Sequence, residues 1–126
     1  MPLARILTVY IALVLGITIS ACTHNDKFAF GQDVGDSRRG QQLIYSYNCG
    51  SCHIIPGIAE AKGTVGPPLR AFGSRIYISG SLLNSPENLF RWIREPQQVE
   101  AGTAMPNLGV TKEQAIDIAA YLYTLQ

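Results

Sequence analysis

The sequence predicts a small all-α domain. Apolar residues recur at helical spacing in separate segments, helix-capping residues precede these segments, and no alternating apolar and polar run is long enough to predict a strand. The chain has 126 residues, of which 47% are hydrophobic and 15% are charged. This composition is too apolar for a disordered protein and suits one domain with a modest core.

The first 21 residues have the parts of an export signal. Arg5 supplies a positive start, residues 6–19 form an unbroken apolar run, and small residues follow that run. A retained transmembrane anchor is the alternative. However, a spanning helix usually needs about 20 apolar residues, and this run is shorter and contains Gly16. We therefore expect residues 1–21 to be a signal peptide.

Cys22 ends the sequence Ile-Ser-Ala-Cys, which resembles the lipobox of bacterial lipoproteins. The resemblance implies that Cys22 receives a diacylglyceryl group and becomes the first residue after cleavage, which would anchor the protein in a membrane. A free thiol next to a simple leader is the alternative. Because an exported chain rarely leaves an odd cysteine without a role, we expect a lipid-anchored protein on the periplasmic side of a bacterial membrane.

Residues 22–36 are polar and contain several glycines, which is typical of a flexible tether. Phe28 and Phe30 are exceptions, and they either pack onto the domain or lie exposed. No internal repeat or low-complexity block divides the remainder, so we expect one domain over residues 37–126.

The domain begins and ends with segments of helical pattern. Ser37 can cap a helix over residues 38–48, whose apolar side chains near one face are Leu43, Ile44 and Tyr47. Near the C-terminus, Thr111 and Gln114 form a capping box for a last helix. Its apolar stripe consists of Ile116, Ala119, Ala120 and Tyr123.

A third helix is predicted between these two, over residues 86–95. Leu89, Trp92 and Ile93 lie at positions i, i+3 and i+4, so they share one face of this helix. Pro96 should end it, because a proline restricts the residue before it to extended conformations.

The most specific motif is Cys49-Gly50-Ser51-Cys52-His53, a C-x-x-C-H sequence that indicates attachment of a c-type haem. Two thiols about one helical turn apart can add to the two vinyl groups on one edge of the porphyrin. The adjacent His53 is then carried beneath the ring, where an imidazole nitrogen can bind the iron.

A redox dithiol and a zinc site are the alternative interpretations of a C-x-x-C pair. A dithiol would call for a strand-rich thioredoxin pattern, which this sequence lacks. Zinc would need two further ligands, but the only other histidine is His24 in the expected tether, and there is no fourth cysteine.

Met105 is the candidate for the second axial ligand of the haem iron. Apart from the initiator it is the only methionine, and Pro106 follows it in a glycine-containing, loop-like segment. A methionine that fills a gap in the core is one alternative, and His24 is a rival ligand. A His53/Met105 pair would raise the reduction potential, since the soft thioether favours ferrous iron.

The chain resembles class I c-type cytochromes of bacterial type over residues 37–126. The matching features are Gly40 and Tyr45 in the first helix, the C-x-x-C-H motif, Gly66-Pro67-Pro68-Leu69, residues 103–109 around Met105, and residues 119–122 in the last helix. The resemblance implies a cytochrome c fold of about three to five helices wrapped around one covalently attached haem c. It also implies that the first and last helices cross, with Gly40 allowing a close approach.

The resemblance further implies polar partners around the haem. In the family, the histidine ligand donates its other N–H to the first proline carbonyl of the Gly-Pro-x-Leu segment, here Pro67, which fixes the ring. The haem propionates also need donors, because buried carboxylates without partners are costly. The candidate donors are Arg75, Tyr77, Asn84 and Trp92; a solvated Arg75 and a core-packed Trp92 are the alternatives.

An iron with both axial positions filled offers no ready site for a substrate. We therefore predict an electron carrier between membrane-associated redox partners rather than an enzyme, with no small-molecule substrate. A fixed haem c subunit of a larger oxidase or dehydrogenase complex is one alternative, and a gas-sensing or peroxidase-like protein with Met105 displaced is another. The formal net charge of +1 provides no basic field for nucleic acid, so no nucleic-acid partner is expected.

Overall fold

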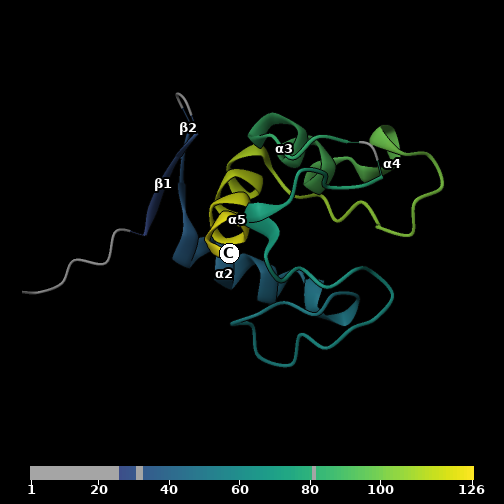
Figure 1. The fold of residues 1–126 in the computed structure, drawn as a ribbon, viewed down its shortest axis with the longest axis horizontal. Coiled ribbons are helices and arrows are strands. Elements are labelled where there is room, and N and C mark those ends of the chain that lie inside the picture. The colour runs from purple at the N-terminus through teal and green to yellow at the C-terminus, as the bar shows by residue number, and fades with distance from the viewer. Residues whose placement is uncertain (1–25, 31–32, 81) are drawn as a thin grey trace, which may run out of the picture.

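The C-terminal helix α5 (Lys112–Thr124) lies at the centre of the fold (Figure 1). The structure is a computed structural model that describes residues 26–30, 33–80 and 82–126. All residues of α5 from 115 to 122 are buried. The helix contacts four other elements: β2 (Asp33–Asp36), α2 (Ser37–Ser46), the 3-10 helix η2 (Phe72–Ser74) and α3 (Pro86–Arg94). The helix is therefore packed on several sides and not only along the stripe that the sequence predicted.

Helix α2 (Ser37–Ser46) packs across α5 at a glycine. A Cβ atom added to Gly40 would lie 1.9 Å from the backbone oxygen of Asp117, so the two backbones are in direct contact. The predicted close approach at Gly40 is thus confirmed. The helix is capped by Asp36 and not by Ser37: the Asp36 carboxylate accepts a hydrogen bond from the Arg39 N–H at 3.0 Å.

Helix α3 (Pro86–Arg94) confirms the predicted middle helix to within one residue. The hydroxyl of Ser85 caps it by accepting a hydrogen bond from the Asn88 N–H at 3.3 Å. Helix α3 ends just before Pro96, and Pro96 itself begins the one-turn helix α4 (Pro96–Val99). Proline is accepted there as the first residue of a new helix, where its missing N–H has no intrahelical partner to lose.

A β-hairpin is the main departure from the predicted all-α fold. Strands β1 (Lys27–Phe30) and β2 (Asp33–Asp36) pair antiparallel, with Lys27 opposite Asp36 and Phe30 opposite Asp33. The domain is therefore mostly helical but not purely α. Each strand has only four residues, too few for an alternating pattern to stand out from the polar, glycine-containing sequence around them.

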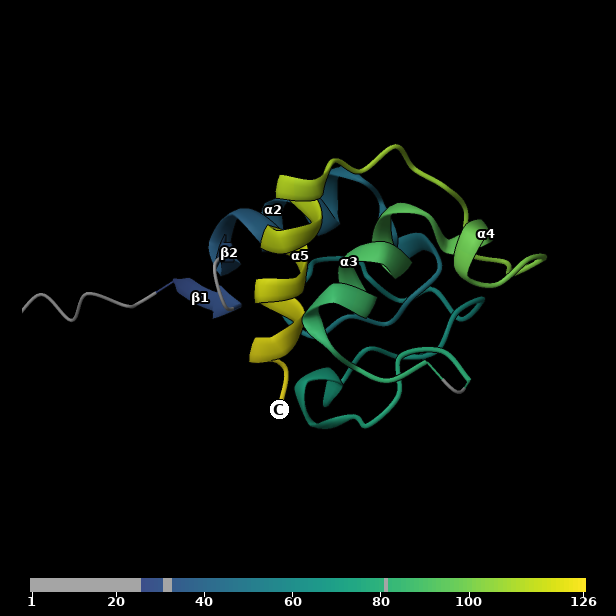
Figure 2. The same cartoon turned by 90° about the horizontal axis from the view of Figure 1, so that it is seen from above.

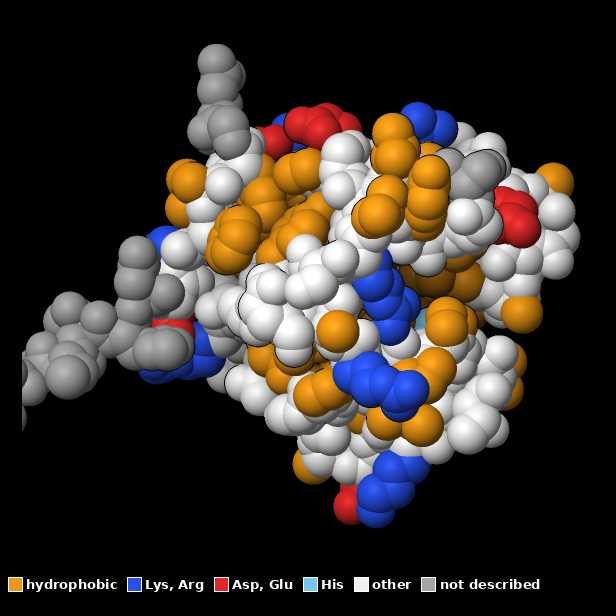
Figure 3. Space-filling model, viewed as in Figure 1, with side chains coloured by type: hydrophobic (Ala, Val, Ile, Leu, Met, Phe, Trp, Pro, Cys, Tyr) orange, Lys and Arg blue, Asp and Glu red, His pale blue; other side chains and the backbone are white. Residues whose placement is uncertain are grey.

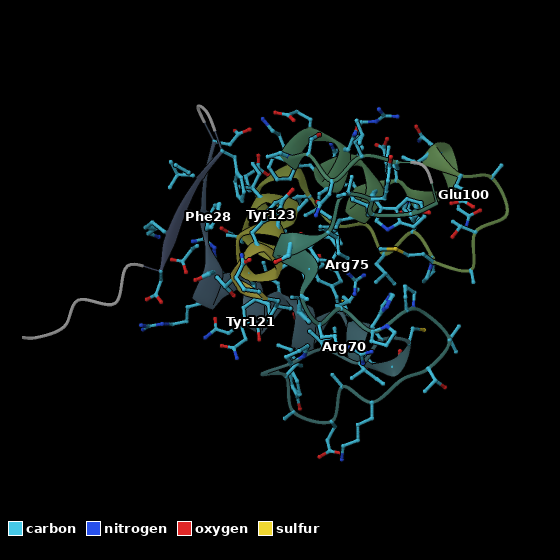
Figure 4. All side chains as sticks on the ribbon, viewed as in Figure 1. Phe28, Arg70, Arg75, Glu100, Tyr121 and Tyr123 are labelled. Atoms are coloured by element: carbon cyan, nitrogen blue, oxygen red, sulfur yellow. The ribbon has the colours of Figure 1, made fainter. Side chains whose placement is uncertain are left out.

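The hairpin is held against the domain by aromatic rings, at positions that the sequence assigned to a flexible tether. Phe30 is buried, and its ring meets the ring of Phe90 edge-on at 5.5 Å between centroids. Phe28 stacks on Tyr123 of α5 at 5.9 Å, and Figure 4 shows the two side chains next to each other (Figure 4). Of the two alternatives, packing onto the domain holds for Phe30, whereas Phe28 contacts Tyr123 with one side and stays 38% exposed.

An ion pair between the buried Asp117 and the exposed Arg39 joins the hairpin, α2 and α5. The side chain of Asp117 is only 3% exposed, and its carboxylate accepts hydrogen bonds from Arg39 Nε and Nη2 and from the Asp36 N–H, the last at 2.8 Å. A buried charge is costly unless it is paired and hydrogen-bonded, and here three donors satisfy it. A charged residue on the most buried helix thus fixes how the hairpin and α2 enter the fold.

The hairpin lies on one side of α5, while α4 and the loop that follows it lie on the other side (Figure 2). The predicted signal peptide, the predicted lipidation site Cys22 and the rival ligand His24 lie within residues 1–25, outside the described residues. Among the described residues, no helix is long and apolar enough to cross a membrane.

We expect Gly40→Ala to lower the free energy of unfolding by about 3 kcal/mol, because the added methyl group would collide with backbone rather than with a movable side chain. Denaturant unfolding measures this loss. Gln42→Ala on the exposed side of the same helix is the control and should change stability by less than about 0.5 kcal/mol. Equal midpoints for Gly40→Ala and the unmodified protein would contradict the close crossing.

Candidate haem-binding site

One cavity brings together the four iron-binding and attachment residues that the sequence singled out. Cys49, Cys52, His53 and Met105 all line a space of about 660 Å³. This volume falls in the range of about 300–1,000 Å³ that is typical of cofactor sites. Hydrophobic side chains make up most of the wall, and they are visible in the hollow between the upper and lower right-hand parts of Figure 3 (Figure 3).

The C-x-x-C-H motif forms the cavity wall at the end of α2. Asn48 adopts a left-handed conformation (φ 55°), which ends the helix and turns the chain into the 3-10 helix η1 (Cys49–Ser51). The His53 N–H then donates to the Cys49 carbonyl at 3.0 Å, closing one helical turn. This turn brings both thiols and the imidazole to the same wall.

The imidazole of His53 is oriented by a backbone carbonyl. Its Nδ1 lies 2.8 Å from the Pro67 oxygen, and because a carbonyl can only accept, Nδ1–H is the donor. Nε2 is therefore the nitrogen with a free lone pair for a metal. Such a hydrogen bond fixes the tautomer and strengthens donation by the opposite nitrogen, as the resemblance implied for Pro67.

Gly66 lets the backbone lie directly against the imidazole ring. A Cβ atom added to Gly66 would be 2.2 Å from His53 Cε1 and 2.6 Å from Nδ1. The Gly66 N–H donates to the Cys52 carbonyl at 2.8 Å, and the Leu69 N–H donates to the Ile54 carbonyl at the same distance. The Gly-Pro-x-Leu segment is thus tied along the motif that carries the ligand.

Met105 reaches the same cavity from the loop between α4 and α5, distant in sequence from His53. The cavity is thereby lined by two thiols, an imidazole with one free nitrogen, and a thioether. This set of donors in an apolar cavity is the one that a c-type haem with His/Met coordination requires. The residues present therefore fit that group.

The environment of Cys49 argues against a redox dithiol. Burial raises the pKa of the Cys49 thiol, and the neighbouring Cys52 raises it further. A raised pKa disfavours the thiolate, which is the reactive form in dithiol chemistry and in zinc binding. Across residues 26–30, 33–80 and 82–126, no group of three or more His, Cys, Asp or Glu side chains is gathered to hold a metal ion.

Only one of the four predicted propionate donors lines the cavity. Trp92 lines the cavity, as Pro67 does. Arg75, Tyr77 and Asn84 are described by the structure but are not among the residues that line it. Tyr77 is 50% exposed and pairs with Leu83 in an isolated β-bridge. Donation to haem propionates therefore stays a prediction for the four residues.

Arg75 and Asn84 bind backbone carbonyls of the segment that follows Pro67. Arg75 Nη2 donates to the carbonyls of Pro68 and Arg70, the latter at 2.9 Å. The Asn84 amide donates to the carbonyls of Phe72 (3.0 Å) and Arg75 (3.1 Å). Figure 4 shows Arg70 and Arg75 on the segment around the 3-10 helix η2 (Phe72–Ser74). Both side chains thus brace the stretch that follows Pro67.

The sequence did not single out three polar residues on the side of the site that carries Met105. Ser79 and Glu100 both line the cavity, and the Ser79 hydroxyl donates to Glu100 Oε2 at 2.6 Å. Gln97 on α4 donates to carbonyls of the loop that holds Met105. No pattern marks these residues, because each is an ordinary polar residue whose partner is a backbone group, a hydroxyl or a carboxylate that the fold brings close.

We expect Gly66→Ala to displace the His53 ring from the Pro67 carbonyl, because the new methyl group would occupy the position of the imidazole edge. The absorption spectrum of the exported protein should then show a lower yield of haem and high-spin features. Thr64→Ala, at an exposed position that does not line the cavity, is the control and should keep the normal yield. A normal low-spin spectrum for Gly66→Ala would show that the ring is not confined there.

Known proteins with similar sequences also point to a cytochrome c domain. The family model described as Cytochrome c matches residues 37–126. Cytochrome c oxidase subunit 2 of Alkalihalophilus pseudofirmus is 35% identical over 91 residues, covering 71% of this chain and 26% of the relative.

Two further relatives carry the same name. Cytochrome c oxidase subunit 2 of Bacillus sp. is 32% identical over 89 residues, covering 68% of this chain and 25% of the relative. That of Bacillus subtilis is 32% identical over 72 residues, covering 55% and 20%. The chain spans about a quarter or less of the length of these relatives. With the C-x-x-C-H turn, the oriented His53 and Met105 on one cavity, the chain belongs to the cytochrome c family.

Proposed function

We propose that the protein is an electron carrier that moves single electrons through one covalently attached haem c. Cys49 and Cys52 would hold the haem through thioether bonds, and His53 and Met105 would be its axial ligands. The observation that carries the proposal is that one apolar cavity gathers these four side chains from segments far apart in the sequence. The Cytochrome c family match supports it.

When bound, the haem supplies a one-electron iron couple. The chain contributes by holding both axial ligands in place and by keeping water from the site. The Pro67 carbonyl holds the Nδ1 proton of His53, so Nε2 stays unprotonated for coordination. Buried apolar side chains such as Ile44, Leu89 and Leu122 line the cavity and keep it dry. A low-polarity site with a thioether ligand favours the reduced state and a high potential.

With His53 and Met105 both bound, the iron would have no open position for a substrate, which supports a carrier without enzymatic activity of its own. We also propose that the protein is exported, lipid-modified at Cys22 and held on the periplasmic side of a bacterial membrane. The sequence of residues 1–22 supports this location. Confinement to one surface would raise the effective concentration of membrane-bound redox partners.

We expect the oxidised protein to show the weak near-infrared sulfur-to-iron band, and Met105→His to lose it. The reduction potential of the variant should fall by on the order of hundreds of millivolts, since axial ligands set haem potentials over about 0.8 V. Visible spectroscopy and potentiometry measure both effects. Ala101→Ser, at an exposed position of the same loop that does not line the cavity, is the control that should retain the band. High-spin features in the unmodified protein would favour the gas-sensing or peroxidase-like alternative.

A fixed haem c subunit of an oxidase is the second candidate, favoured by the name shared by the three relatives. The test is affinity purification of the tagged protein from membranes dissolved in mild detergent. For a free carrier we expect the protein to elute without stoichiometric partners. Co-elution with an oxidase in equal amounts would replace the carrier proposal with the subunit, while the chemistry at the haem would stay the same.

A further inference from the structure

The loop that carries Met105 has no regular backbone structure of its own. It runs from the end of α4 to the start of α5 without forming a helix or strand. Ala104, Met105 and Pro106 all line the cavity. A segment without a ladder of backbone hydrogen bonds needs other donors and acceptors to fix its conformation. The position of the thioether therefore depends on polar contacts to the loop backbone.

Gln97 makes three of these contacts with one side-chain amide. Its Nε2 donates to the Thr103 carbonyl at 2.6 Å and to the Met105 carbonyl at 3.0 Å. Its Oε1 accepts from the Gly102 N–H at 3.3 Å. Both amide protons and the carbonyl oxygen are thus used on the same stretch of loop. This arrangement fixes the curvature of the backbone on each side of Ala104.

Gln97 can act as a fixed point because α4 is itself anchored. Pro96, the first residue of this helix, is among the most completely buried side chains of the described residues. The helical turn is closed by the Val99 N–H, which donates to the Glu95 carbonyl at 3.2 Å, and by the Glu100 N–H, which donates to the Pro96 carbonyl at 2.9 Å. The amide of Gln97 therefore extends from a supported turn.

The other hydrogen bonds of the loop are more local. The Thr103 N–H donates to the Glu100 carbonyl at 3.2 Å, and the Met105 N–H meets the Thr103 hydroxyl at 3.4 Å. Ser79 holds Glu100 and so the end of α4, not the Met105 backbone. Within the described residues, Gln97 is the side chain that joins the helix directly to the Met105 carbonyl.

We propose that Gln97 is the positioning residue for Met105, holding the loop so that the thioether stays on the haem iron. This inference rests on the proposed function, because it takes Met105 as an axial ligand. Gln97 itself does not coordinate the iron. It acts by making the loop conformation with Met105 in place more stable than conformations in which the loop has moved away.

The test is Gln97→Glu, which keeps the shape of the side chain but removes both donated hydrogens and sets negative oxygens against two carbonyls. We expect the fraction of molecules with Met105 detached to rise about tenfold, as the loss of two exposed hydrogen bonds implies. Two measurements report it: the pH at which the sulfur-to-iron band of the oxidised protein disappears should fall, and carbon monoxide should bind the reduced protein about tenfold faster. Gln97→Ala, which adds no charge, should change both in the same direction.

Gln98→Glu is the matched control, since it makes the same charge change on the next, exposed residue of α4. It should leave both readouts as in the unmodified protein, and thereby separate the hydrogen bonds from the effect of charge. If Gln97→Glu and Gln97→Ala both behave like the unmodified protein, the inference is wrong while Met105 ligation stands. If the unmodified protein lacks the band, Met105 ligation itself fails and the inference fails with it.

Discussion

The close crossing of α2 and α5 is the contact on which the rest of the structure depends. The backbones touch at Gly40, and the buried Asp117 ties the crossing to Arg39 and to the start of α2. The C-x-x-C-H motif follows directly from the end of α2, and the Met105 loop leads directly into α5. The two proposed axial ligands, His53 and Met105, therefore stand at positions fixed by one helix pair. A small shift at this crossing would change the cavity on both of its sides.

Polar groups around the cavity act mainly on backbone rather than on one another. The Pro67 carbonyl orients His53, Arg75 and Asn84 bind carbonyls of the segment behind it, and Gln97 binds carbonyls of the Met105 loop. Loops have no ladder of hydrogen bonds of their own, so side chains from neighbouring elements supply the missing donors. This arrangement lets irregular segments present ligands with a defined geometry.

The sequence predicted the parts of this structure that depend on local chemistry. The capping box of Thr111 and Gln114 gives the observed start of α5, and the C-x-x-C-H spacing places two thiols and an imidazole on one wall. Met105 was found because a methionine followed by proline is unusual in a gap-filling role. These features depend on residues close together in the chain, where spacing carries the information.

Features that depend on distant contacts were not predictable in the same way. The hairpin and the adjacent cap at Asp36 depend on two ring contacts. Phe28 contacts Tyr123 and Phe30 contacts Phe90, and no local pattern indicates either pair. Arg75 was predicted to donate to a haem propionate, whereas the structure shows its guanidinium bound to the carbonyls of Pro68 and Arg70, on a loop whose path the sequence does not specify. The role of Gln97 was missed for the same reason.

The docked hairpin also determines where the chain enters the domain. The Ser37 N–H donates to the Asp26 carbonyl at 2.7 Å, so the first described residue is held beside the start of α2. In Figures 1 and 2 this corner lies on the side opposite α4 and the Met105 loop. A reporter domain or an electrode linker joined ahead of Asp26 would therefore leave the cavity accessible.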